Sequence, residues 1–151
     1  MDDDAVEAYL DELRATIDEH GHAVQQVASG GDEPGWSYTI GLDAFELPEL
    51  IIVGGVPRGE QGSILNGLAA RMRDGEELEL GARDPSVLEG FDVTYVEVAD
   101  TTTEDFAVAL RLQRSFRAVQ IVWPDVQNRF QWDPGYAFPP REQRLLGSPG
   151  T

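Results

Sequence analysis

The sequence contains neither cysteine nor lysine. Without cysteine the chain has no disulfide bond, no thiolate zinc site and no cysteine nucleophile. Without lysine, the 11 basic residues are all arginine and stand against 28 acidic residues, so the formal net charge is −17. Two explanations of this bias stay open: the codon usage of a high-GC genome, and adaptation to high salt, where acidic charge keeps proteins solvated.

The negative charge also excludes several classes of partner. Nonspecific binding to nucleic acid requires basic side chains that neutralise phosphates, and anionic membrane surfaces require them too. We therefore expect neither nucleic acid nor a membrane as a partner. A basic protein fits the charge, because electrostatic steering would accelerate its approach.

Long apolar runs are missing as well. No stretch of about 18 apolar residues could form a transmembrane helix, and the acidic start MDDDAVEAYL lacks the basic and apolar regions of a signal peptide. The sequence thus predicts a cytoplasmic protein. Its 151 residues, 41% of them hydrophobic, fit one domain with a single core.

Three segments have the apolar periodicity of amphipathic helices. Gly21 and Gly75 follow the first two at positions where helices commonly end, and Thr102 or Thr103 can cap the third. The predicted helices span residues 4–20, 60–74 and 103–116.

Six further segments are predicted to be strands. Glu49–Val53 is apolar after its first residue, which is typical of a strand covered on both faces. Short connections favour a mainly antiparallel mixed sheet in an α+β domain of order αβββαββαβ. The domain is expected to span residues 1–138, followed by an extended, partly mobile tail over 139–151. The predicted strands are 22–28, 35–42, 49–53, 77–80, 91–98 and 118–123.

No segment matches a complete catalytic or metal-binding motif. His20 and His22 lack a third ligand at a motif spacing, so neither a metal nor another cofactor is predicted. Ser37 in GWSYT lacks the glycine pattern of a nucleophile elbow. GGVPRGEQGS opens a helix whose first N–H groups, with Arg58, could attract an anion, yet it matches neither glycine-rich phosphate motif.

Aromatic residues gather near GWSY and in the segment after Pro124. Such residues are enriched at recognition surfaces, but they also contribute large buried areas, so the C-terminal segment could equally complete the core. Asp125 and Asp133 each adjoin a proline, which suits either turn formation or general acid–base chemistry. The aromatics concerned are Trp36, Tyr38, Trp123, Phe130, Trp132, Tyr136 and Phe138.

The stretches GWSYTIGL, LPELIIVGG, ILNGLAARMRDG, VQIVWPD and FQWDPGY together resemble a known family, catalogued as domain of unknown function 4262. The resemblance runs from about His22 to Tyr136. It implies a compact bacterial or phage domain of α+β type and implies no activity. FELPEL stands where members often have Gly-His before Pro-Glu-Leu, so no role of that histidine carries over. The matching signature residues are Tyr38, Thr39, Gly41, Leu42, Pro48, Glu49, Leu50, Trp123, Pro124, Asp125 and Trp132.

Two kinds of function fit these observations. The first is a noncatalytic protein-binding or regulatory module, favoured by the lack of a recognisable catalytic set. The second is an enzyme or small-ligand protein that binds a phosphate, nucleotide or flavin-like molecule, with a pocket near the Gly54–Gly59 turn and the Trp123–Asp125 segment. Whether the chain is an enzyme stays open. The candidate site residues are Tyr38, Thr39, Glu49, Arg58, Trp123, Asp125, Trp132, Asp133 and Tyr136.

Overall fold

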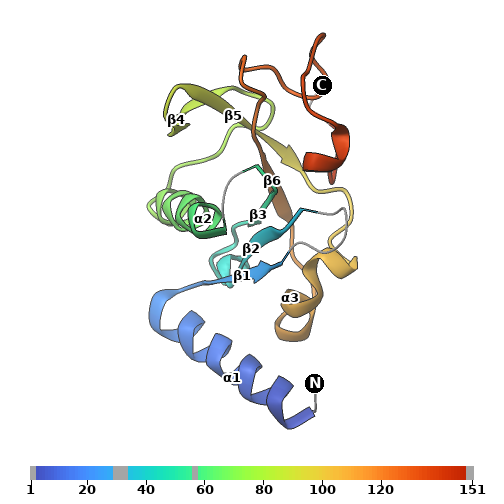
Figure 1. Cartoon of the computed structure of the whole chain (residues 1–151). Coiled ribbons are helices and arrows are strands. Elements are labelled where there is room, and N and C mark those ends of the chain that lie inside the picture. The colour runs from blue at the N-terminus through green and yellow to red at the C-terminus, as the bar shows by residue number, and fades with distance from the viewer. Residues whose placement is uncertain (1–2, 29–33, 56–57, 149–151) are drawn as a thin grey trace.

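The computed structural model describes residues 3–28, 34–55 and 58–148. Its centre is a six-stranded sheet of order β1-β2-β3-β6-β5-β4 (Figure 1). The central strands β3 and β6 are parallel, whereas the pairs β1–β2, β2–β3, β5–β6 and β4–β5 are antiparallel. The strands are β1 (Ala23–Val27), β2 (Trp36–Ile40), β3 (Glu49–Val53), β4 (Asp84–Leu88), β5 (Phe91–Glu97) and β6 (Ala118–Val122).

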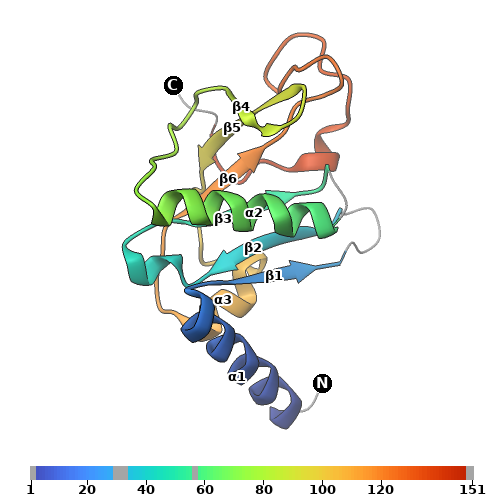
Figure 2. The ribbon, with the colours of Figure 1, turned by 90° about the vertical axis from the view of Figure 1, so that its left-hand side faces the viewer.

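Helices cover both faces of this sheet. Helix α2 (Arg58–Arg73) lies across one face, as Figure 2 shows, and buries Leu65, Leu68 and Met72 against β3 and β6. Helices α1 (Asp3–His20) and α3 (Ala107–Leu112) pack on the other face, where Leu10, Leu13 and Phe106 meet Tyr38. The prediction that β3 is covered on both faces is confirmed, because its five residues are all buried. No described helix is long and apolar enough to cross a bilayer.

The α+β class, the mixed sheet and the order of elements are confirmed, but the fourth strand was predicted at the wrong place. Residues 77–80 form no strand, and β4 follows them at Asp84–Leu88. Leu78 packs against the core while Leu80 is 49% exposed. The apolar–polar alternation of residues 77–80 therefore belongs to a loop that only Leu78 anchors to the core. Pro85 argues against a strand in the sequence, yet it is tolerated because β4 is an edge strand.

The third helix is shorter than predicted. A 3-10 turn, η2 (Glu104–Phe106), precedes it, and the Thr103 side chain accepts a hydrogen bond from the Asp105 amide, which confirms that residue as the cap. The helix ends at Leu112 because Gln113 adopts an extended backbone. The chain from there to Phe116 returns to the core, where the Phe116 and Phe106 rings meet edge to face at 5.4 Å.

The segment after Pro139 differs from an extended tail. It contains a 3-10 helix, η3 (Pro140–Gln143), and the Gln143 side chain is fully buried. The Gln143 amide pairs with both backbone groups of Trp123, at 2.8 and 2.9 Å. The Leu146 amide donates to the Gln120 side chain at 2.8 Å. Residues up to Leu146 thus pack on the sheet with the rest of the domain.

Candidate functional site

The signature residues Thr39 and Glu49 meet inside the molecule, not on its surface. Glu49 is fully buried at the start of β3. Its carboxylate accepts hydrogen bonds from the Thr39 hydroxyl at 2.8 Å and from the Gln113 side-chain amide at 2.9 Å. It also accepts from three consecutive backbone amides, those of residues 41, 42 and 43, at 3.0–3.2 Å.

These three amides converge because Gly41 has a left-handed backbone, with φ of 116°, immediately before the 3-10 turn η1 (Leu42–Phe45). Successive N–H groups in such a conformation form a concavity that binds anions. Here Glu49 fills it as an internal anion. Burial raises the pKa of Glu49, and hydrogen bonds from Gln113, Thr39 and the backbone offset part of that rise. The Y-T-x-G-L and P-E-L signature motifs therefore contact each other inside the fold, through the hydrogen bonds of Glu49.

Tyr38 is also buried and structural. Its hydroxyl accepts a hydrogen bond from the Val108 amide at 3.1 Å, which fixes the start of α3 against β2. Its ring meets Phe106 edge to face at 5.3 Å. Burial raises the pKa of Tyr38 to about 12. Tyr38 therefore stays neutral at physiological pH and anchors a helix.

Asp125 holds the turn that follows β6. One carboxylate oxygen accepts from the Gln127 and Arg129 amides, and the other accepts from the Ala137 amide and the Arg129 guanidinium, all at 2.9–3.0 Å. Burial alone would raise the pKa of Asp125, but the hydrogen bonds from Arg129, Ala137 and Gln127 hold it below its ordinary value. With four donors engaged, this carboxylate is a poor proton acceptor.

The substitution Asp125→Asn is expected to remove a pH-dependent contribution to the free energy of unfolding. Because the folded-state pKa of Asp125 is depressed, its ionised form stabilises the fold at every pH above its unfolded pKa of about 3.9. That contribution is lost as the pH falls through the folded-state pKa. In urea titrations, the stability difference between wild type and Asp125→Asn should be constant between about pH 7 and pH 5 and shrink below about pH 4. A difference that stays constant down to about pH 3 would contradict this expectation.

Asp133, Trp132 and Tyr136 lie in the loop that Asp125 closes. The Asp133 carboxylate accepts from the Phe130 amide at 2.8 Å and from Arg83 at 3.2 Å. Trp132 is 41% exposed and stacks on Phe130 with ring centroids 5.2 Å apart. The Tyr136 hydroxyl is buried. Burial raises its pKa, and the neighbouring Gln143 side chain offsets part of that rise.

The three candidate carboxylates do not form a shared acid–base site. Within the described part of the chain, Glu49, Asp125 and Asp133 have no hydrogen-bond donor in common, and each accepts from the backbone amides of a different turn. Turn formation, the alternative considered for Asp125 and Asp133, accounts for all three. Asp125 borders the pocket beside Trp123, but its two carboxylate oxygens already accept four hydrogen bonds, which disfavours a general-base role.

An apolar pocket lies beside Trp123 and Asp125. Its volume is about 290 Å³, and the Trp123 indole forms one wall, held by a 2.8 Å hydrogen bond from its ring N–H to the Val53 carbonyl. A Cβ atom at Gly55 would overlap this indole, so glycine allows the close approach. Phe91 and Val126 are 37% and 69% exposed. The lining residues are Gly55, Leu88, Glu89, Phe91, Trp123, Pro124, Asp125, Val126 and Phe138.

Two other sequence hypotheses concern the glycine turn and the histidines. Residues 56–57 and the Arg58 side chain lie outside the part that the structure describes, so an anion site there stays a prediction. His22 Nε2 lies 2.8 Å from the Asn66 side-chain oxygen, and the His20 carbonyl accepts from Arg73 at 2.7 Å. Within residues 3–28, 34–55 and 58–148, no group of three or more acidic or histidine side chains could hold a metal ion.

Sequence reasoning missed the residues that complete the pocket and the buried contacts. Leu88, Phe91 and Val126 come from β4, β5 and the turn after β6, which only the sheet order brings together. Gln113 and Gln143 are polar partners of buried groups. One signal was available for Phe91, because aromatic residues are enriched at recognition surfaces.

The chain is similar to a known protein family. The model of a family described as a domain of unknown function, DUF4262, matches residues 16–137. No curated protein and no solved structure matches the chain.

Proposed function

The chain belongs to the DUF4262 family, and from the geometry beside Trp123 we propose that it is a noncatalytic module that binds a basic protein partner. The observation that carries the proposal is the apolar pocket of about 290 Å³. We propose that it receives one apolar side chain of the partner. Clustered exposed apolar residues at the mouth of a pocket are typical of protein interaction sites.

The polar groups of the pocket support a binding role over catalysis. Among the residues that the structure describes, its lining contains two acidic residues, Glu89 and Asp125, and no serine, threonine, histidine or tyrosine. Asp125 already accepts four hydrogen bonds, and its lowered pKa makes it a weak base. The described lining offers shape and apolar surface, and none of its residues is placed to act as a nucleophile or general base.

The charge of the chain supports a basic partner. A net charge of −17 on 151 residues creates a strongly negative field, which attracts cationic proteins and repels anionic ones. The apolar pocket would then supply affinity after this encounter. Burial of one phenylalanine side chain contributes roughly 1.5–3 kcal/mol.

A matched pair of peptides tests the proposal. We expect acetyl-Arg-Gly-Phe-Gly-Arg-amide, titrated into ¹⁵N-labelled protein, to shift the amide resonances of Leu88, Phe91 and Val126. The Phe→Ala peptide should bind about 10- to 100-fold more weakly, given the burial free energy of the ring. Val126→Asp should abolish the effect of the ring, whereas Gln127→Asp, which adds the same charge outside the lining, should preserve it. Equal binding of the two peptides would overturn the proposal.

A small-molecule ligand is the second candidate function, and the volume of the same pocket favours it. About 290 Å³ is close to the lower end of ordinary ligand pockets, roughly 300 Å³. Its apolar lining fits an aromatic ring system better than a phosphate, and Glu89 would repel an anion. A thermal shift caused by riboflavin or adenosine, lost in Val126→Asp, would support this function, since a specific ligand raises apparent stability by mass action.

A further inference from the structure

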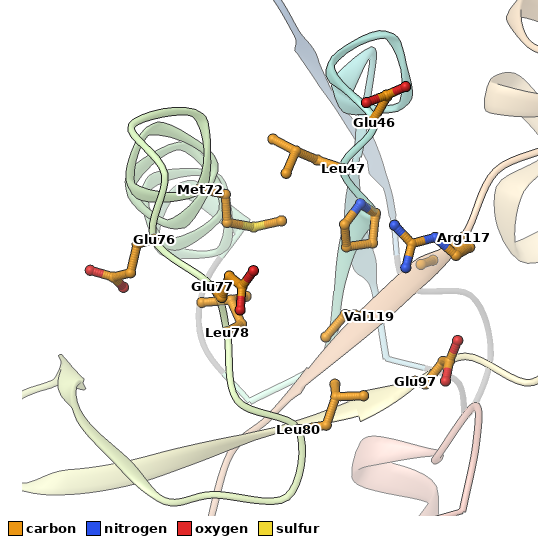
Figure 3. Close-up of a pocket in the computed structure, with 12 residues that line it drawn as sticks. Glu46, Leu47, Met72, Glu76, Glu77, Leu78, Leu80, Glu97, Arg117 and Val119 are labelled. Carbon is orange, nitrogen blue, oxygen red and sulfur yellow. The ribbon is translucent and has the colours of Figure 1, made fainter.

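A second pocket, at the opposite end of β6, has a different chemistry (Figure 3). Its volume is about 330 Å³. It lies between the C-terminal end of α2, the segment that follows this helix, and the starts of β3 and β6. Its floor is apolar and contains Leu47, Met72, Leu78 and Val119. Leu80, which is 49% exposed, extends this apolar surface towards solvent.

Acidic side chains from three separate segments surround this floor. Glu46 follows η1, Glu76 and Glu77 follow α2, and Glu97 ends β5, as Figure 3 shows. Glu76 is already paired with Arg71. Among the described residues, Glu46, Glu77 and Glu97 form no ion pair. Three carboxylates without an ion-pair partner among the described residues therefore line a pocket whose base is hydrocarbon.

We propose that this acidic pocket binds a lysine or arginine side chain of a protein partner. Such a side chain has an aliphatic stem that packs on apolar surface and a charged head that stays near the rim. The stem would lie on Leu78, Leu80 and Val119, with the head beside Glu77 and Glu97. An apolar ligand would desolvate the rim carboxylates without compensation, and an anion would be repelled. The charge pattern thus selects a cationic amphipathic group.

Arg117 would limit the affinity of this pocket. It is the basic residue of the lining, and it forms no ion pair among the described residues. Figure 3 shows its side chain on the same side of the pocket as Glu97. A positive charge there opposes an incoming cation and offsets part of the glutamate field. Removing the Arg117 charge should therefore tighten the binding of a cation. Removing an arginine far from the pocket should not have this effect.

Small probes test the acidic pocket by itself. We expect Nα-acetyl-arginine methylamide or Nα-acetyl-lysine methylamide, titrated at low salt, to shift the amide resonances of Leu78, Leu80 and Val119. The uncharged analogues of the two probes, the citrulline and norleucine compounds, should bind at least about fivefold more weakly. Binding of a neutral analogue as strong as that of its cation would overturn the inference.

Charge-changing variants separate this site from the overall charge of the protein. Glu77→Gln and Glu97→Gln should each weaken the cationic probes by about 1.5- to 5-fold, as expected for exposed ion pairs, whereas Glu12→Gln on α1 should leave them unchanged. Arg117→Gln should strengthen binding by a similar factor, and Arg114→Gln, outside the lining, should not. Equal effects inside and outside the pocket would mean that only net charge acts, and this would overturn the inference.

The inference shares one premise with the proposed function, namely that the partner is a basic protein. The acidic pocket and the apolar pocket beside Trp123 can nevertheless be rejected separately. The cationic amides carry no aromatic ring, so they report on the acidic pocket and leave the apolar pocket beside Trp123 untouched. Probe binding at Leu78 and Val119 together with equal binding of the Phe and Ala peptides would retain the acidic pocket and reject the apolar one. The reverse pattern would reject the cation site and retain the proposed function.

Discussion

Replacing Glu49 with alanine is expected to lower the free energy of unfolding by roughly 3–5 kcal/mol, because five hydrogen-bond donors, three of them buried and two part-buried, lose their acceptor together. Each unsatisfied buried donor costs about 1–3 kcal/mol, and water that enters the vacated space recovers part of this sum. Typical domains are stable by only about 5–15 kcal/mol, so Glu49→Ala should unfold at much lower urea concentration.

Two further variants give this expectation its controls. Glu49→Gln keeps the shape but places an NH₂ group where the carboxylate accepts hydrogen bonds, so it should cost at least about 2 kcal/mol. Glu12→Ala removes the same charge from the exposed face of α1 and should change stability by less than about 0.5 kcal/mol. If both Glu49 variants lost less than about 1 kcal/mol, the five donors would have other partners in solution, and the structural role of Glu49 would be wrong.

The sequence predicts the secondary structure best where burial is most uniform. Glu49–Val53 could be assigned with its observed ends because four consecutive apolar residues fit a strand covered on both faces. The error between residues 77–80 and β4 has the opposite origin. An edge strand pairs on one side only, so β4 tolerates Pro85 and the polar residues Asp84 and Ser86, and its sequence is that of a loop.

The two faces of β2 show where sequence reasoning about the site ends. The alternation in GWSYTIGL correctly assigns Tyr38 and Ile40 to the core, while Ser37 and Thr39 are small, polar residues on the opposite face. The structure covers them too: Ser37 donates to Gln61 of α2 at 2.7 Å, and Thr39 donates to Glu49. Both partners are distant in the sequence and polar, so no apolar periodicity could indicate that this face is buried.

The signature acids illustrate the same limit. Glu49 and Asp125 have the residue types of a catalytic pair, and one sequence cannot distinguish a free carboxylate from one that holds a turn. The structure distinguishes the two cases, because the Glu49 and Asp125 carboxylates each accept four or more hydrogen bonds and so hold turns. The pocket beside Trp123 likewise depends on the order β6-β5-β4, which brings Leu88 and Phe91 to the Trp123 segment.

Gln143→Ala is expected to lower the free energy of unfolding by about 2–4 kcal/mol, although an extended tail would predict no effect. The variant leaves the buried N–H and C=O groups of Trp123 without partners, and each costs about 1–3 kcal/mol. It also frees η3 and the Trp123 wall of the apolar pocket, so tryptophan fluorescence should report a more exposed indole before global unfolding. Gln131→Ala provides the matched control, since the half-buried Gln131 side chain donates to the Gln143 carbonyl and shares no hydrogen bond with Trp123 among the described residues. Equal stability of the two variants would contradict the anchoring role of Gln143 and would mean that residues 139–148 contribute little to the stability of the domain.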